Sequence, residues 1–294
     1  LWNIVNHICI DEAQQWLLEN HYRGEAYRSL ASPATYFRTV CLSGTTPCDE
    51  MAMDMAQAMN IQQDEFEVLT SMSTVVPTHV RLDVVQANYN DTLVSMDAEG
   101  IPRAASAQRA SNGTHVIVTV GDEEIKLTES NYDALHRCAT LFCRQLEKCH
   151  VMMICAKKNE ARALHQLVKD LVKHNMSGQM SDLREPKTAL LTGDDNAEIK
   201  LEVGRKWSDG KIHGLISTRV MIYGTQNRKM GMIICKDLPP NASDLVQMGH
   251  RKRDTRGTIP AQLVLVLRDG DECREQIWEE GNGRMIHYLY HNVD

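Results

Sequence analysis

The chain has 294 residues, of which 43% are hydrophobic and 24% charged, and its formal net charge is -7 at pH 7. This composition is that of an ordinary globular protein and excludes a largely disordered chain. The negative charge excludes a protein that coats nucleic acid with its whole surface, so any contact with nucleic acid must be local.

The sequence contains no apolar stretch of the roughly 18 residues that a membrane helix needs, and no basic and apolar leader opens it. Its nine cysteines include no CxxC pair, so their spacing indicates neither a zinc ribbon nor a disulfide framework. We therefore expect an intracellular protein without membrane contact, whose cysteines are reduced and mostly serve as small core residues.

Apolar runs that end in polar residues and are followed by a helical period recur along the chain, as in parallel α/β proteins. We expect strands at residues 4–10, 40–42 and 150–156. A helix should precede the third of these strands, capped by Thr128 or Ser130, and another should follow it. Their apolar stripes are Leu135, Ala139, Phe142 and Leu146, and then Leu164, Leu167 and Leu171. Further strands are expected at residues 214–218, 230–235 and 263–267.

Two stretches lack this pattern. Residues 72–90 lose their periodicity and are predicted to be a linker, and the small, polar residues 98–113 are predicted to form an exposed loop or insertion. Residues 114–127 alternate around a central Gly-Asp, which predicts a β-hairpin. We therefore place a domain boundary near residue 75. The predicted parts are a first domain at 1–75, a second at 76–270 with an insertion near 98–127, and a tail at 271–294.

The first apolar run, in the stretch ICIDEAQQW, ends in the adjacent carboxylates Asp11 and Glu12. Ligands bind at the carboxyl edge of the sheet in open α/β folds. An aspartate there can hold Mg2+ through its water shell, and the next carboxylate can orient or deprotonate a water for phosphoryl transfer. Alone, the pattern is more typical of an ordinary polar strand end.

Neighbouring motifs give the carboxylate pair a context. IDEAQ resembles the Walker B motif of superfamily-two helicases of the DEAH-like kind, with Gln14 where histidine is usual. His21-Tyr22-Arg23, followed by Tyr27, is similar to the aromatic-rich segment that RecQ-like helicases place after that motif. LSGTTP, residues 42–47, resembles their third motif, which couples nucleotide state to DNA contact.

The second half extends the resemblance. HVMMICAKKNEARAL is similar to motif IV, and GLISTRVMIYGTQNRKMGMIIC aligns with the motif V block, with Thr218 and Gly224 at matching positions. The segment from Gln247 to Asp254 resembles motif VI, whose arginines contact the γ-phosphate of ATP. The resemblance to RecQ-like DNA helicases spans roughly residues 4–267.

The resemblance implies an α/β fold of two RecA-like parallel-sheet domains, the first truncated because it lacks its Walker A half and the second complete. It implies the motor core of an ATP-dependent helicase that moves 3′ to 5′ on DNA, uses ATP and Mg2+, and is nuclear if its source is eukaryotic. The implied catalytic residues are Asp11, which holds Mg2+ through water, Glu12, which activates water, and Arg253, the arginine finger. The implied ATP-binding residues are Gln14, Gly224, Gln247, His250 and Arg251. The implied DNA-binding or coupling residues are His21, Tyr22, Arg23, Ser43, Thr45 and Thr218.

The sequence also departs from the family pattern. GxxxxGK[ST] does not occur, so we expect either a fragment that begins inside the first RecA-like domain or a degraded relative, and Leu1 favours the fragment. The alternative function is a non-catalytic, helicase-derived module that binds DNA or protein, and the alternative fold class is an unrelated α/β ligand-binding domain. No four-cysteine zinc module follows residue 270.

Motifs V and VI are irregular as well. Matching Gly249 to the family glycine puts His250 at the first arginine and Arg253 at the finger, and we prefer it because it also keeps Asp254 in place. An ungapped match from Gln247 puts Arg251 first and leaves Asp254 at the finger position. Ile222 replaces a glycine and Gln226 an aspartate in motif V.

Overall fold

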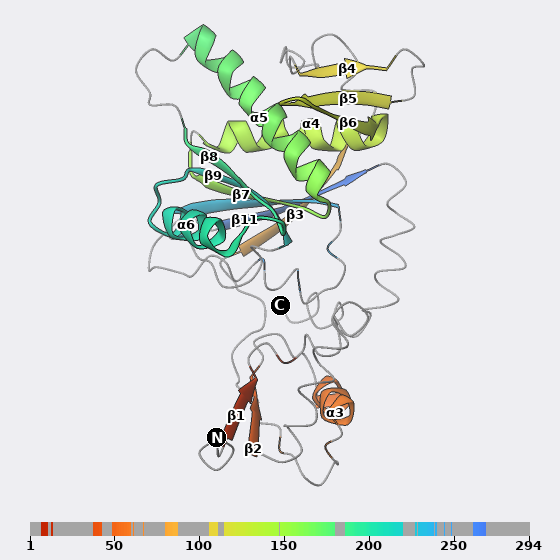
Figure 1. Cartoon of the computed structure of the whole chain (residues 1–294), viewed down its shortest axis with the longest axis vertical. Helices are drawn as coiled ribbons and strands as arrows, with labels where there is room; N and C mark the ends of the chain where they lie inside the picture. Colours follow the sequence, from red (N-terminus) through yellow and green to blue (C-terminus); the bar gives the residue numbers. More distant parts are fainter. Residues whose placement is uncertain are drawn as a thin grey trace. The chain divides into compact units, whose positions relative to one another are not determined.

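The chain forms two compact units, Leu1–Val76 with Gly283–Asp294, and Pro77–Asn282. Each is described by itself, in a computed structural model (Figure 1). The structure describes residues 7–10, 13, 38–42, 49–59, 61, 67, 80–87, 106–110, 115–146, 148–179, 186–219, 227, 229–237, 239, 244, 248 and 261–268.

The described part of the first unit pairs two short strands. β1 (His7–Ile10) runs parallel to β2 (Arg38–Cys41). Helix α3 (Asp49–Ala58) follows, and Met55 and Met59 form a small core with Ala13. The expected strands at 4–10 and 40–42 are therefore confirmed over residues 7–10 and 40–41.

The second unit is built on a six-stranded sheet in which every pair of neighbours is parallel. The strand order is β3-β11-β10-β7-β9-β8. Of the strands in this sheet, β3 comes first in the sequence and lies at one edge, beside β11, which comes last. The strands are β3 (Val80–Ala87), β7 (His150–Cys155), β8 (Thr188–Leu191), β9 (Gly214–Thr218), β10 (Met230–Lys236) and β11 (Ala261–Arg268).

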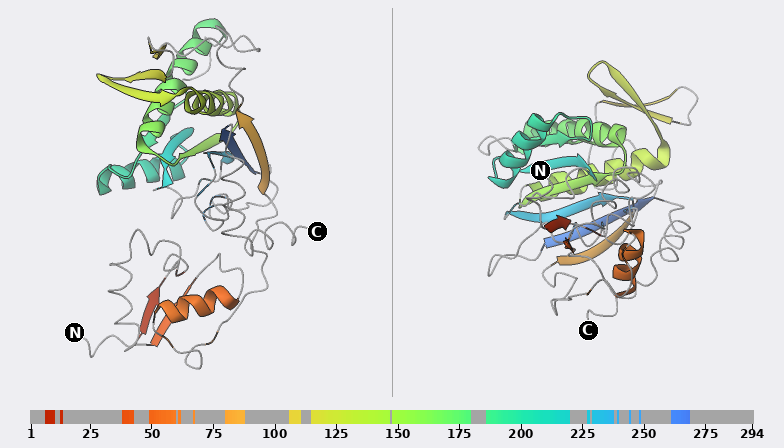
Figure 2. Two further views of the ribbon diagram at one scale, coloured as in Figure 1. Left: turned by 90° about the vertical axis from the view of Figure 1, so that its right-hand side faces the viewer. Right: turned by 60° about the horizontal axis from the view of Figure 1, so that its bottom comes forward.

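Helices cover both faces of this sheet (Figures 1 and 2). α4 (Glu129–Leu146) and α5 (Lys158–Gln179) pack on one face, and α6 (Ala197–Ser208) lies on the other. In β7, Val151 and Met153 contact the core under α4 and α5, whereas Met152 and Ile154 join the core that contains Trp207 of α6. Burial on both faces explains why the central strands are continuous apolar runs.

An antiparallel sheet of three strands packs against α5. It consists of β4 (Ala107–Arg109), β5 (His115–Val120) and β6 (Glu123–Thr128). β5 and β6 form the expected hairpin, with Val120 opposite Glu123, and Gly121 takes a positive φ of 63° in the two-residue loop. The strands alternate in burial, and their inward side chains extend the core of α4 and α5. These inward side chains are Val116, Val118, Ile125 and Leu127.

Several expected elements of the second unit are confirmed. The strand predicted at 214–218 has those ends, and the strands predicted at 150–156 and 230–235 differ by one residue at one end. The strand predicted at 263–267 begins two residues earlier and ends one residue later. Helix α4 has Thr128 at its N-terminus, where the Asn131 backbone N–H donates to Thr128 Oγ1 at 3.3 Å. Of the two residues considered as the cap, Thr128 therefore fills that role.

The linker predicted at residues 72–90 is wrong in its second half, where β3 pairs with β11 from Val80 to Ala87. The strand lies at the sheet edge with one hydrogen-bonded neighbour, and its sequence VRLDVVQA alternates apolar and charged residues over only a few positions. The loop predicted at 98–113 contains the short strand β4, and β8 and α6 were not anticipated.

Candidate functional site

The carboxyl edge of the six-stranded sheet is the candidate site. Because all six strands are parallel, their carboxyl ends lie at the same edge, where ligands bind in open α/β sheets. α5 begins at Lys158, three residues after β7 ends, and α6 begins at Ala197, six residues after β8 ends. Both helix N-termini therefore lie at this edge and carry partial positive charge.

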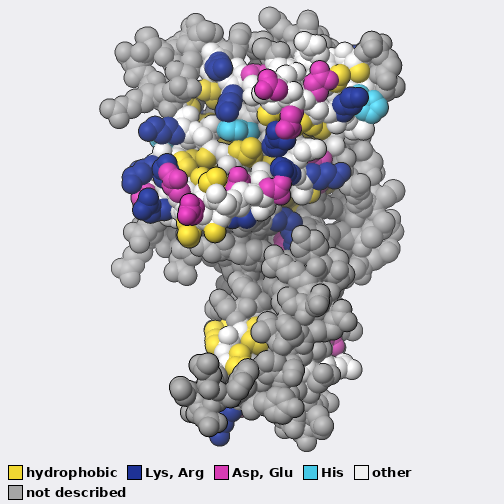
Figure 3. Space-filling model, in the orientation of Figure 1, with side chains coloured by type: hydrophobic (Ala, Val, Ile, Leu, Met, Phe, Trp, Pro, Cys, Tyr) yellow, Lys and Arg dark blue, Asp and Glu magenta, His cyan; other side chains and the backbone are white. Residues whose placement is uncertain are grey.

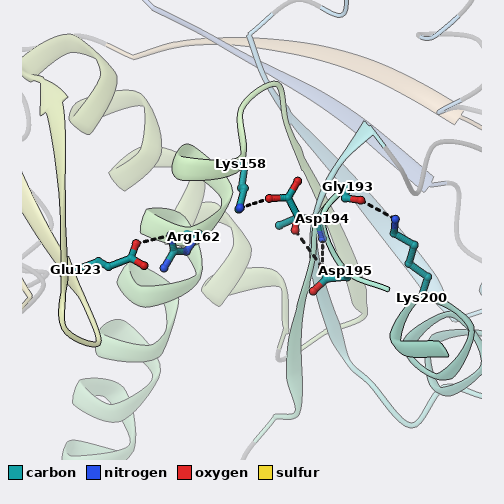
Figure 4. Close-up of polar contacts among 8 residues, drawn as sticks. Glu123, Lys158, Arg162, Gly193, Asp194, Asp195 and Lys200 are labelled. Atoms are coloured by element: carbon teal, nitrogen blue, oxygen red, sulfur yellow. Dashed lines mark hydrogen bonds and ion pairs between the residues drawn. The ribbon is translucent and has the colours of Figure 1, made fainter. Parts of the chain in front are cut away.

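A polar network orders the loop after β8 (Figure 4). Asp195 Oδ2 accepts hydrogen bonds from the Thr192 backbone N–H at 2.5 Å and from Thr192 Oγ1 at 3.1 Å. Asn196 caps α6, since its Oδ1 accepts from the Ile199 backbone N–H at 2.8 Å. This loop is thus held by its own side chains.

Lysines connect the same loop to the helices on either side (Figure 4). Lys200 Nζ of α6 donates to the Gly193 carbonyl at 2.6 Å, and Lys158 of α5 forms an ion pair with Asp194. The hydrogen bond and charge of Lys158 lower the pKa of Asp194. Lys157 and Lys158 are both exposed, but the charge of Lys158 is balanced by Asp194. The ammonium of Lys157 is suited to a phosphate group.

The charges on this side of the second unit are mixed in sign. Lysine and arginine side chains lie beside aspartates and glutamates over the helices (Figure 3). Glu123 of β6 pairs with Arg162 of α5 at 2.6 Å, and this contact lowers the pKa of Glu123. On this face the described basic side chains thus lie among acidic ones.

Thr218, the one proposed coupling residue within the described part, ends β9 at this edge. Its neighbour Ser217 is buried and donates from Oγ to the Thr218 carbonyl at 2.5 Å. Arg219 follows, and its guanidinium pairs at 2.5 Å with Asp244, which is fully buried. The segment after β9 is thus joined to a residue that follows β10.

Lys236, the last residue of β10, is the second buried charge at this edge. Its side chain is fully buried, with Nζ 3.2 Å from Glu160 Oε2 and 2.6 Å from Asp237 Oδ2. Asn131 Nδ2 donates to the other oxygen of Glu160 at 3.1 Å. The site residues predicted from the sequence do not include Lys236, Glu160, Arg219 or Asp244. A lysine at the end of the apolar run MGMIICK was the available signal.

The thiols near Lys236 are core residues. Burial raises the pKa of Cys138 and Cys155, and it raises that of Cys235 to about 12. These thiols therefore stay protonated and unreactive at neutral pH. Four of the seven described cysteines are buried: Cys138, Cys143, Cys155 and Cys235.

The first unit has its own carboxyl edge, where β1 and β2 end. The Leu42 backbone N–H donates to the Ile10 carbonyl at 2.8 Å, and the Ala13 N–H donates to the Leu42 carbonyl at 2.9 Å. These bonds fix the residues on both sides of the Asp11-Glu12 pair beside the end of β2. The remaining proposed site residues lie outside the described part of the chain. They are Asp11, Glu12, Gln14, His21, Tyr22, Arg23, Ser43, Thr45, Gly224, Gln247, His250, Arg251 and Arg253.

Among the described residues, no helix has the length and apolar character needed to cross a membrane. Nor do these residues contain a cluster of three or more histidine, cysteine, aspartate or glutamate side chains placed to hold a metal ion.

No protein-family model and no curated protein matches the sequence. Solved structures do match the fold. The S. cerevisiae protein Dbp5, bound to RNA and ADP BeF3, superposes with a TM-score of 0.55 at 14% identity over 95% of this chain and 58% of its own. The fold is RecA-like.

Two proteins named as helicases also share this RecA-like fold. The DUF1998 helicase MrfA, bound to DNA and AMPPNP, has a TM-score of 0.55 at 12% identity, over 94% of this chain and 32% of its own. Mycobacterium smegmatis helicase Lhr, bound to ssDNA and AMP-PNP, has a TM-score of 0.53 at 17% identity, over 90% of this chain and 29% of its own. The chain thus spans less than two thirds of each of the three proteins. The expected α/β class with RecA-like parallel sheets is confirmed.

Proposed function

We propose that the chain is the motor core of a RecQ-like helicase that uses ATP to move 3′ to 5′ on single-stranded DNA and to unwind duplexes. The observation that carries this proposal is the RecA-like sheet of the second unit, whose carboxyl edge brings together Thr218, the basic start of α5 and the two buried charge pairs. The proposed domains are residues 1–75, 76–270 with an insertion near 98–127, and a tail at 271–294. The proposed location is intracellular, and nuclear in a eukaryote.

The proposed roles follow the helicase resemblance. Glu12 orients the attacking water, and Arg253 stabilises charge on the transferred phosphoryl group. Gln14, Gly224, Gln247, His250 and Arg251 contact ATP, and His21, Tyr22, Arg23, Ser43, Thr45 and Thr218 contact DNA or couple it to nucleotide. Three structural neighbours bound to nucleic acid and to a nucleotide or its analogue support both ligand classes.

Mg2+ suits the donor chemistry of the first unit. Asp11 follows Ile10 at the end of β1, and a carboxylate oxygen is the kind of ligand that Mg2+ prefers. When bound, the ion would supply positive charge to the phosphate oxygens. Asp11 would hold it through water.

A non-catalytic module that binds DNA or protein is the second candidate. The observation in its favour is that GxxxxGK[ST] does not occur in these 294 residues, since this loop cradles the phosphates in P-loop enzymes. We therefore propose that these residues alone do not turn over ATP.

DNA-stimulated ATP hydrolysis separates the two candidates. We would measure it for the chain alone and for the chain extended by native upstream coding sequence that carries GxxxxGK[ST], each beside a Glu12→Gln control. The motor proposal expects hydrolysis in the extended protein and a loss of about 100-fold or more in its Glu12→Gln variant. Absence of hydrolysis from both proteins, with single-stranded DNA still bound, would instead establish the binding module.

A further inference from the structure

The buried lysine at the end of β10 requires an explanation. Lysine is almost never fully buried, because removing an ammonium from water is costly unless it is paired. Lys236 meets that condition through Glu160 and Asp237, with oxygens 3.2 and 2.6 Å from its Nζ. Well-packed apolar residues usually stabilise a core equally well. Packing alone therefore gives no reason for a charge here.

The ion pairs join segments that are distant in sequence. Glu160 lies in the first turn of α5, beside the exposed Lys157 and Lys158. Asp237 is the first residue after β10 and starts the chain toward the motif VI-like segment. A single ammonium thus holds the beginning of a helix and the exit of a strand at the same sheet edge.

Other contacts make this junction rigid. Asp237 has a φ of 66°, in the left-handed region that side chains other than glycine seldom adopt. Its N–H donates to the Val266 carbonyl of β11 at 3.0 Å, and Cys235 Sγ donates to its carbonyl at 3.3 Å. Asn131 of α4 holds the far oxygen of Glu160 at 3.1 Å. The direction in which the chain leaves β10 is therefore set by neighbours on β11 and α5.

We propose that Lys236 is a positioning residue, which fixes the start of α5 against the exit of β10 so that the exposed lysines at the start of α5 are held in place to engage nucleic-acid phosphates. This positioning role rests on the proposed function, because it requires that the lysines at the start of α5 contact nucleic acid. Lys236 itself is buried and acts through Glu160 and Asp237.

The first test asks, without any ligand, whether Lys236 holds the start of α5 and the exit of β10 together. We would compare backbone amide exchange in the chain with that in Lys236→Met and in a control, Lys206→Met, which removes the exposed pair of Lys206 with Glu202 within α6. Exchange should accelerate by about tenfold or more both in the first turn of α5 and at Asp237 in Lys236→Met, and at neither place in the control. Acceleration at only one of the two places, or at neither, overturns the proposal.

The second test measures how the loss of Lys236 changes the salt dependence of nucleic-acid binding. Affinity for a single-stranded oligonucleotide would be measured against salt concentration, at a temperature where each variant retains its native circular dichroism. The slope of log affinity on log salt should become shallower by about 1 in Lys236→Met, because fewer phosphates are engaged at once, and stay unchanged in Lys206→Met. Loss of stability alone lowers the melting temperature and leaves this slope intact. An unchanged slope in a folded Lys236→Met protein rejects the positioning role.

Two provisions keep the tests decisive. If Lys236→Met does not fold, Lys236→Met combined with Glu160→Gln removes the ammonium together with the more deeply buried of its two carboxylates, and the same two outcomes apply to it. If the unmodified chain binds no single-stranded DNA at any salt concentration, the proposed function fails, and the exchange test alone decides whether Lys236 connects the two segments.

Discussion

Two histidines of the second unit are kept neutral by their surroundings. Burial, helped by the charge of Lys169, lowers the pKa of His165 to about 4. Burial and the charges of His213 and Lys229 lower the pKa of His150 to about 4 as well. In the unfolded chain both rings would titrate near 6.5. Between these values the unfolded chain takes up protons that the folded chain does not.

Acidification should therefore destabilise the second unit. Stability is fully present above about pH 6.5 and is lost as the pH falls toward 4, because protons bind preferentially to the unfolded state. His165→Leu removes one of the two titrations, and the Nε2 of His165 has no hydrogen-bond partner to lose among the described residues. Between pH 7 and pH 5 the variant should lose less free energy of unfolding than the parent, by about 2 kcal/mol. Urea unfolding at both pH values measures this, and equal losses would contradict it.

At the scale of elements, β9 and α4 approach each other more closely than a side chain allows. A Cβ added to Gly214 would lie 2.5 Å from Phe142 Cζ and 2.9 Å from Leu146 Cδ2. The nearest neighbour is an aromatic ring, buried in the core between helix and sheet, and it has no free space into which to move. Glycine is required here for packing.

Gly214→Ala should destabilise the second unit by about 1 to 3 kcal/mol, because it overfills a well-packed contact. Gly193→Ala is the matched control, since a Cβ there meets no atom within 4 Å. Urea denaturation of the two variants compares them under the same conditions. Equal midpoints for the two variants would show that the contact between β9 and α4 can relax.

Which elements the sequence predicts depends on where they lie in the sheet. β7, β9 and β10 are buried on both faces, and continuous apolar runs locate them to within a residue or so at each end. The edge strand β3 was not predicted, because its charged residues interrupt the apolar pattern. The short strand β8 is followed at once by loop residues and gives little periodic signal.

The candidate site was predictable in a different way. Motif resemblance selected Thr218, and the structure puts it at the carboxyl edge of the sheet. The pairs of Lys236 with Glu160 and of Arg219 with Asp244 join residues that are 76 and 25 positions apart. Such pairing depends on the three-dimensional fold, and no local pattern in one sequence reveals it.

At the scale of the whole molecule, the two units differ in what they need for stability. The described part of the first has one pair of parallel strands, and an isolated pair of this length is marginal in water. The second has a complete sheet covered on both faces and two apolar cores. The second unit therefore has what an independent domain needs.

Residues 77–282 should therefore fold alone, with a cooperative thermal transition and dispersed amide resonances. The same segment carrying Gly214→Ala, which should melt at a lower temperature, controls for a native core. A broad transition, or exposed apolar surface that binds a fluorescent dye, would show that the segment depends on the remainder of the chain.

The pairing of β3 with β11 has a consequence for biosynthesis. β3 begins at residue 80, and among the described strands its hydrogen-bonded neighbour is β11, which begins at residue 261. During translation β3 therefore emerges from the ribosome long before its partner exists. Its backbone groups stay unpaired through the synthesis of all five other strands, and an unpaired strand edge of that kind is a starting point for misassembly. Chaperone dependence in this protein should thus be concentrated in the interval before β11 leaves the exit tunnel.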